Sequence, residues 1–233
     1  MKVSIHQPNY IPWAGYFYKI YKSDVFVFLD DVQYSNEGMH NYHYLKTPQV
    51  PLRLKIPIDY HFGDDICAVR TKDELHWKEI NLQLLEANYK KAPYFKEVFE
   101  DFKAILTIDY PNMAALNMEI IRYFARKLNI TTQFVNASSL LIDAHREEKV
   151  ISICKSLLAT EYFSGTGARS YQKEENFTKE GIKLTYLNYK PVEYKQLWGD
   201  FHANVSILDY LMNCGYDFEP VLNQQVLEYE GIR

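Results

Sequence analysis

Cysteine is scarce in this sequence, and Cys67, Cys154 and Cys214 stand far apart without a CxxC pair. Such a set supplies neither a disulfide framework nor the ligand spacing of a zinc site. No apolar run approaches the roughly 18 residues that a membrane-spanning helix needs. The first residues, MKVSIHQPNY, also lack the apolar core of a signal peptide, so we expect a cytoplasmic protein.

An excess of basic residues is absent as well. The chain has 26 Lys and Arg against 30 Asp and Glu, a formal net charge of −4. Because nucleic-acid binders normally carry a basic excess, this composition argues against a nucleic-acid partner. What the sequence does contain is aromatic side chains, which make up 15% and include 20 tyrosines. This content excludes a disordered chain and indicates ring-lined surfaces or pockets.

Hydrophobic patterning predicts an α/β fold. A β-prone run at 2–5, helical spacing over 13–20 and five consecutive apolar residues at 25–29 indicate a β–α–β unit. Helical periodicity follows at 73–91, 93–106, 111–128, 146–158 and 168–180, and further strands are expected at 52–58, 131–136, 161–164 and 182–187. We expect one domain over 1–233 with a mainly parallel, Rossmann-like or nucleotidyltransferase-like sheet and a helical insertion or subdomain at about 73–130.

Polar residues gather where the first predicted strand ends, and ligands of open α/β sheets bind at such strand ends. They are His6, Gln7, Asn9 and Tyr10, with Trp13 at the start of the next helix. His6 suits a general base, a phosphate contact or a metal ligand. The alternative is a histidine that only stabilises a strand-end turn. The density of donors and acceptors around it favours function.

Two adjacent carboxylates, Asp30 and Asp31, end the second predicted strand, and Gln33 and Tyr34 follow them. Because side chains alternate along a strand, one carboxylate can face the site. It could coordinate a divalent cation or hold a substrate amine, whereas the alternative is a solvated turn acid. The sequence contains no cofactor motif, so a divalent cation is the one cofactor it suggests.

A glycine-rich turn lies between the strand at 161–164 and the helix expected at 168–180. It consists of Ser164, Gly165, Thr166 and Gly167, followed by Arg169 and Tyr171. A strand, such a turn and a helix start form an anion-binding geometry, and Arg169 can add a bidentate phosphate contact. The alternative is a tight turn that needs glycine for its backbone conformation.

Long segments of the sequence resemble the WbqC-like protein family. They are HQPNYIPWAGYFYKIYKSDVFVFLDDVQYS from His6, KTPQ from Lys46, KIPI at 55–58, YFSGTGARSY at 162–171, GIKLTYLNY at 181–189 and SILDYLMNCG at 206–215. The resemblance implies a role in bacterial surface-polysaccharide (O-antigen) biosynthesis and an enzyme that transfers a glycyl or formyl group to an amino sugar. It adds Asn41 and Lys46 to the expected substrate-binding residues. A likeness in architecture alone connects the chain with adenylating enzymes that carry a HIGH motif.

The leading hypothesis is therefore an acyl-type transferase whose small-molecule substrates are a nucleotide-linked amino sugar and an acyl donor. His6 would be the base, Asp30 or Asp31 would orient it, and Arg169 with the glycine turn would hold a diphosphate. Five rings, Tyr10, Trp13, Tyr34, Tyr42 and Tyr44, are expected to wall a pocket around His6. An ATP-dependent adenylating or nucleotidyl transferase and a non-catalytic sugar-nucleotide-binding protein stay open as alternatives, as do the metal requirement and the oligomeric state.

Overall fold

The computed structural model of the protein describes residues 1–230, and its centre is a parallel sheet of five strands. The strands are β1 (Lys2–His6), β2 (Val25–Phe28), β7 (Gln133–Asn136), β8 (Glu161–Gly165) and β9 (Lys183–Leu187). They lie in the order β7-β2-β1-β8-β9, and every pairing between them is parallel. The predicted α/β fold with a mainly parallel sheet is confirmed. Because the chain builds outward in both directions from β1, the point where the strand order reverses lies between β1 and β8.

Helices cover both faces of this sheet, because each buried strand presents apolar side chains to both sides. On one face Phe26 and Phe28 of β2 share a core with α1 (Ala14–Tyr21) and α4 (Met113–Lys127). On the other face Val25 and Val27 pack with α5 (Arg146–Ser156) and α6 (Glu174–Lys179). The same alternation in β1 directs Val3 and Ile5 toward α5 and α6. His6 therefore faces the α1 side of the sheet.

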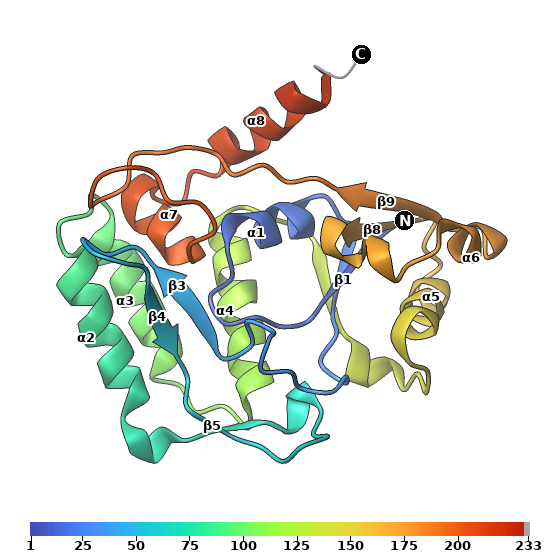
Figure 1. Cartoon of the computed structure of the whole chain (residues 1–233), viewed down its shortest axis with the longest axis horizontal. Coiled ribbons are helices and arrows are strands. Elements are labelled where there is room, and N and C mark those ends of the chain that lie inside the picture. Colours follow the sequence, from blue (N-terminus) through green and yellow to red (C-terminus); the bar gives the residue numbers. More distant parts are fainter. Residues whose placement is uncertain (231–233) are drawn as a thin grey trace.

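The helices expected between residues 73 and 130 are present as α2 (Trp77–Tyr89), α3 (Phe95–Leu106) and α4, preceded by the 3-10 turn η2 (Asp73–Leu75). Figure 1 shows α2, α3 and α7 (Ile207–Cys214) at one end of the molecule and α5 and α6 at the other. The last helix, α8 (Glu219–Glu230), has no counterpart among the sequence predictions. No helix within residues 1–230 has the length and apolar character needed to cross a membrane.

Two sequence predictions of local structure are wrong. The polar and aromatic segment 33–49, where the sequence predicts no strand, contains β3 (Tyr42–Leu45), which pairs with β4 (Leu52–Lys55). The chain continues through β5 (Ile58–Asp59), η1 (Ile66–Ala68) and β6 (Arg70–Thr71). The single helix expected at 168–180 is instead the 3-10 turn η4 (Thr166–Ser170) followed by α6. Between them Gln172 is buried and accepts a hydrogen bond from the Ser164 hydroxyl, which draws the chain inward and interrupts the helix.

Candidate functional site

A cavity of about 970 Å³ opens at the carboxyl ends of β1 and β8, where the strand order reverses. We call it the switch-point cavity. β1, β8, α1, the start of α5 and the segment after β9 all contribute to its wall. Eight residues that the sequence marked as functional line it: His6, Gln7, Trp13, Ser164, Gly165, Thr166, Gly167 and Tyr171. The structure thus brings the first and third predicted clusters together, as the position of ligands in open α/β sheets requires.

The imidazole of His6 is held by its neighbours in one orientation. Its Nδ1 lies 3.0 Å from the Gln7 carbonyl oxygen, which also accepts a hydrogen bond from the Tyr16 hydroxyl at 2.9 Å. The Tyr16 ring packs edge-on against the imidazole at 4.8 Å between centroids. Because a carbonyl only accepts, Nδ1 carries the proton and Nε2 keeps its lone pair.

Burial, and to a lesser degree the nearby Lys19 ammonium, lowers the pKa of His6 to about 3. The imidazole is therefore neutral throughout the physiological pH range. A base performs best with a pKa near the working pH. The low pKa of His6 therefore does not suit the general base that the sequence predicts there. Its environment suits a hydrogen-bond acceptor that orients a substrate N–H or O–H.

Lys19 is a residue of this cavity that the sequence reasoning missed. Its side chain comes from the inner face of α1, is 7% exposed, and donates a hydrogen bond from Nζ to the Ile5 carbonyl oxygen at 2.8 Å. Burial lowers the pKa of Lys19 to about 7. One signal was available in the sequence, because Lys19 stands three residues after Tyr16 and one before Ile20, on the helix face that must be buried.

The glycine turn at 165–167 presents bare backbone to the cavity. Gly165 has an ordinary φ of −80°, and a Cβ added at Gly165 or Gly167 would meet nothing within 4 Å. Neither backbone strain nor a close neighbour therefore requires glycine there, which removes the tight-turn alternative. The turn continues into a 3-10 segment of five residues, so the strong helix dipole expected at this point is absent.

Arg169, the expected diphosphate ligand, is exposed and does not line the cavity. Its guanidinium lies over the Tyr186 ring at 4.9 Å. The basic side chains that line the cavity are instead Lys19 and Arg146. Arg146 opens α5, another position that the sequence patterns did not mark.

Aromatic rings form much of the cavity wall. Tyr189, which follows β9, packs against Trp13 at 5.6 Å and against Tyr18 at 5.7 Å between ring centroids. Its ring also touches the backbone of α1, since a Cβ on Gly15 would come within 2.7 Å of the Tyr189 ring. Gly15 is therefore required by a close approach, and this approach seals the wall between α1 and the segment after β9.

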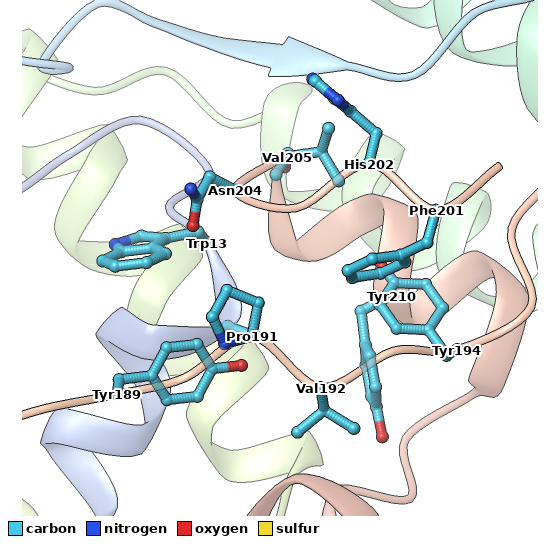
Figure 2. A pocket seen from close by; sticks show the side chains of 12 residues that line it. Trp13, Tyr189, Pro191, Val192, Tyr194, Phe201, His202, Asn204, Val205 and Tyr210 are labelled. Atoms are coloured by element: carbon cyan, nitrogen blue, oxygen red, sulfur yellow. The ribbon is translucent and has the colours of Figure 1, made fainter.

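A second cavity lies behind this wall, and Figure 2 shows it between Trp13 and Tyr189 on one side and Phe201, Tyr194 and Tyr210 on the other. Trp13 and Tyr189 line both cavities, so these two rings separate them. The volume of the second cavity, about 20 Å³, holds one water molecule and no substrate. Of these two cavities, the switch-point cavity is the one with room for a ligand of the expected size.

Asp30 and Asp31 are occupied by other contacts. Both carboxylate oxygens of Asp30 accept hydrogen bonds from Ser138, at 2.9 and 2.7 Å, which ties β2 to the 3-10 turn η3 (Ala137–Leu140). Asp31 forms an ion pair of 2.9 Å with Lys149 of α5, and the lysine side chain is 8% exposed. These bonds turn the two carboxylates toward η3 and α5 rather than toward His6. Within residues 1–230 no group of three His, Cys, Asp or Glu side chains is arranged to hold a metal ion.

The remaining predicted residues lie outside the cavity lining. Tyr10 is buried in the helical core, where its hydroxyl accepts a hydrogen bond from Asn81 at 3.1 Å. Asn41 donates to the Ile56 carbonyl, and Lys46 donates to the Gly199 and Asp200 carbonyls. These are bonds that stabilise the fold. Asn9, Gln33 and Tyr34 likewise do not line the cavity.

The prediction that five rings wall a pocket around His6 is wrong for four of the five. Of the five expected rings only Trp13 lines the cavity, because Tyr42 and Tyr44 pack with Arg53 on the β3–β4 hairpin. Tyr34 packs against Tyr60 at 4.6 Å. The rings that do surround the cavity come from α1, β8, η4 and the segment after β9: Trp13, Tyr16, Tyr18, Tyr162, Tyr171 and Tyr189.

Comparison with known proteins agrees with the resemblance seen in the sequence. The model of the WbqC-like protein family matches residues 7–219. The chain is 35% identical over 218 residues to the uncharacterized protein Rv1507c of Mycobacterium tuberculosis, an alignment that covers 92% of this chain and 94% of that protein. No solved structure is significantly similar to it. The chain belongs to the WbqC-like protein family.

Proposed function

We propose that this protein is a transferase of bacterial surface-polysaccharide (O-antigen) biosynthesis. It binds a nucleotide-linked amino sugar in the switch-point cavity and transfers an acyl-type group, glycyl or formyl, to the amine. Nucleotide-linked sugars are cytoplasmic metabolites, so the proposal includes a cytoplasmic location. Two findings support the proposal: membership of the family that the sequence resembles, and a cavity with room for such a substrate.

The observation that carries the proposal is the pairing of two features in one cavity. His6 offers an acceptor nitrogen, and the 165–167 turn offers backbone that no side chain covers. The acceptor nitrogen suits an amine, because a lone pair that accepts a hydrogen bond from the amine N–H fixes the direction of attack. The uncovered backbone suits a diphosphate, because phosphate oxygens can approach bare backbone N–H groups closely.

The rings of the cavity suit the remaining parts of such a ligand. Trp13, Tyr18 and Tyr189 pack against one another and present apolar faces with polar edges. Sugars and nucleobases bind on surfaces of this kind, because a ring face contacts their apolar side while hydroxyls and N–H groups bond their polar side. The volume of about 970 Å³ admits a ligand as large as a nucleotide sugar.

In the reaction, the amine nitrogen attacks the acyl carbon, and the bond between that carbon and the donor's leaving group breaks. The leaving group departs with the bonding electron pair and takes up the proton that the amine gives up. His6 contributes orientation through Nε2, because its low pKa makes it a weak store for that proton. The loss of one such hydrogen bond typically costs a factor of about ten to a hundred in rate.

The test is an assay of purified protein with amino-sugar nucleotides and either a glycyl or a formyl donor, followed by mass spectrometry of the sugar nucleotide. We expect an acylated product, a strongly reduced kcat for His6→Ala and unchanged turnover for His61→Ala, since the His61 side chain is 92% exposed and lies outside the cavity. Full turnover by His6→Ala would remove His6 from the reaction. Tight binding of the sugar nucleotide without any product would identify a binding protein instead, and Mg²⁺-dependent release of pyrophosphate from ATP would identify an adenylating enzyme.

A further inference from the structure

Three lysines are buried within residues 1–230, and of these Lys149 alone forms an ion pair. Lys46 lies away from the cavity and donates from Nζ to the carbonyl oxygens of Gly199 and Asp200. Lys149 is 6% exposed and forms its ion pair with Asp31 at 2.9 Å. Lys19 is 7% exposed, yet none of the ion pairs found within residues 1–230 includes it. Its Nζ donates to the Ile5 carbonyl oxygen, which occupies one of three ammonium protons.

A buried ammonium without a counter-ion is unfavourable, because no nearby charge repays the loss of its hydration. The lysine therefore either loses its proton or obtains an anion from outside the fold. Lys19 can obtain such an anion, since its side chain lines the switch-point cavity and the cavity is open to solvent. Strongly perturbed groups in clefts of this kind are characteristic of binding and catalytic sites.

The charges around Lys19 favour an anion. From α5, Arg146 adds a second positive charge to the lining and Glu147 adds a negative one. The two carboxylate oxygens of Glu147 already accept hydrogen bonds from the Lys173 backbone N–H and the Asn176 side chain. The carboxylate is thus held by partners outside the cavity, and with Lys19 protonated the lining carries two positive charges against one negative charge.

Other titratable groups that face Lys19 stay neutral. His6 of β1 has a pKa of about 3 because of its burial. Burial also raises the pKa of Tyr162 of β8 and of Tyr189 after β9 to about 12, and it raises the pKa of the Tyr16 and Tyr18 hydroxyls of α1. A change of charge at Lys19 is therefore not masked by these groups between about pH 6 and pH 9.

The glycine turn provides the second, independent sign of an anion. Gly165 and Gly167 line the same cavity, and neither their backbone conformation nor any neighbour requires a residue without a Cβ. Bare backbone lets a phosphate oxygen come within hydrogen-bond distance of main-chain N–H groups. A phosphate or diphosphate has enough oxygens to accept from the turn and from Nζ at once, so the two features together favour phosphate.

We propose that Lys19 binds a phosphate or diphosphate group of the cavity's ligand and takes up a proton when that group binds. The inference deepens the proposed function, since it names the anchor of the nucleotide-linked substrate. An anion beside Nζ favours the charged amine, so binding and protonation are linked and each must promote the other.

Isothermal titration with inorganic pyrophosphate and with UDP as probes tests this, in buffers of different ionisation enthalpy near pH 8. Free Lys19 is then mostly neutral, because its pKa lies about one unit lower. We expect the wild-type protein to bind a probe and to take up close to one proton more than Lys19→Arg, which holds a permanent charge. Lys19→Met should weaken binding at least about tenfold, whereas Lys22→Met, on the same helix but outside the cavity lining, should bind like the wild type.

The proposal fails if neither probe binds, if Lys19→Met binds as tightly as the wild type, or if the wild type and Lys19→Arg take up equal numbers of protons. Thermal unfolding of each variant verifies that it is folded, so that a folding defect is not mistaken for lost binding. The outcome is also separate from the transfer assay. Lys19-dependent proton uptake without acylation would overturn the proposed transfer alone, and acylation at full kcat/KM by Lys19→Met would overturn the role of Lys19 alone.

Discussion

Mild acid should unfold this protein, because the buried His40 and His43 and the partly buried His6 are neutral in the fold. Burial lowers the pKa of His6 to about 3 and the pKa of His40 and of His43 to about 4. His40 is fully buried, and neither of its ring nitrogens has a hydrogen-bond partner among the described residues. His43 accepts the Tyr44 N–H at Nδ1, a bond that protonation of that nitrogen would break. Protonation of each imidazole is therefore unfavourable in the folded protein.

The free energy at stake follows from linkage. In the unfolded chain the three histidines have a pKa near 6.5, so below that pH the unfolded state binds more protons than the folded one. The stability that the neutral imidazoles confer is complete above about pH 6.5 and is lost as the pH falls toward their folded values. At about pH 5 each contributes a loss of roughly 2 kcal/mol, about 6 kcal/mol together. This matches the whole stability of many domains, about 5–15 kcal/mol.

One carboxylate acts in the opposite direction. Asp209 accepts hydrogen bonds from Tyr89, Tyr194 and Gln196, and burial raises its pKa. At the Asp209 carboxylate the folded state can therefore bind at most one proton more than the unfolded state. The net uptake on unfolding between about pH 6 and pH 5 should be two to three protons.

Urea unfolding at a series of pH values between about 7 and 5 measures this uptake as the slope of the unfolding free energy. His43→Gln should reduce the slope by about one proton, whatever it does to the stability near pH 7. His61→Gln should leave the slope unchanged, because the His61 side chain is 92% exposed. A free energy that changes by less than about 1 kcal/mol over this range would show that the buried imidazoles titrate normally, and the reasoning would be refuted.

Two further predictions concern packing and the buried ion pair. Gly15→Ala should lower stability by about 1–3 kcal/mol in urea unfolding, because its Cβ would stand 2.7 Å from the Tyr189 ring, and a variant as stable as the wild type would contradict the close approach. Gly167→Ala, with nothing within 4 Å of its added Cβ, is the matched control and should cost little. Lys149→Met should cost about 3–5 kcal/mol, since it leaves Asp31 buried and unpaired, and adding Asp31→Asn should restore much of it. Equal stability of the single and double variants would contradict the pairing.

The parallel sheet was predictable because the local sequence of its strands is enough to identify them. The apolar run at 25–29 is buried on both faces, and only a strand covered by helices on each side needs that composition. The helices at 73–130 carry their proline boundaries and apolar spacing in the sequence. A strand was expected at 52–58, where β4 lies, but β3 was missed because it is short and mixed in polarity and its identity depends on pairing with β4.

The site was predictable as far as strand ends determine it. His6 and the 165–167 turn follow β1 and β8, and the parallel order brings these ends to one edge. Asp30 also follows a strand, but its partner Ser138 is 108 residues away, and no local pattern shows that η3 will take both carboxylate oxygens. Arg169 turned outward for a similar reason, since Tyr186 on the neighbouring strand offers its ring.

The distribution of satisfied and unsatisfied polar groups separates the parts of the molecule that stabilise from the part that binds. Asp31 with Lys149, and Asp209 with Tyr89 and Tyr194, show that this fold can pair a buried charge or saturate a buried carboxylate. The polar groups of the switch-point cavity lack such partners, because Lys19 has no counter-ion among the described residues and the backbone at 165–167 is uncovered. Both gaps can be filled by the same ligand, and a ligand that fills them must be anionic and must stabilise the fold when it binds. Free energy that Lys19 and the uncovered turn lose on folding is therefore recoverable when a ligand binds in the cavity.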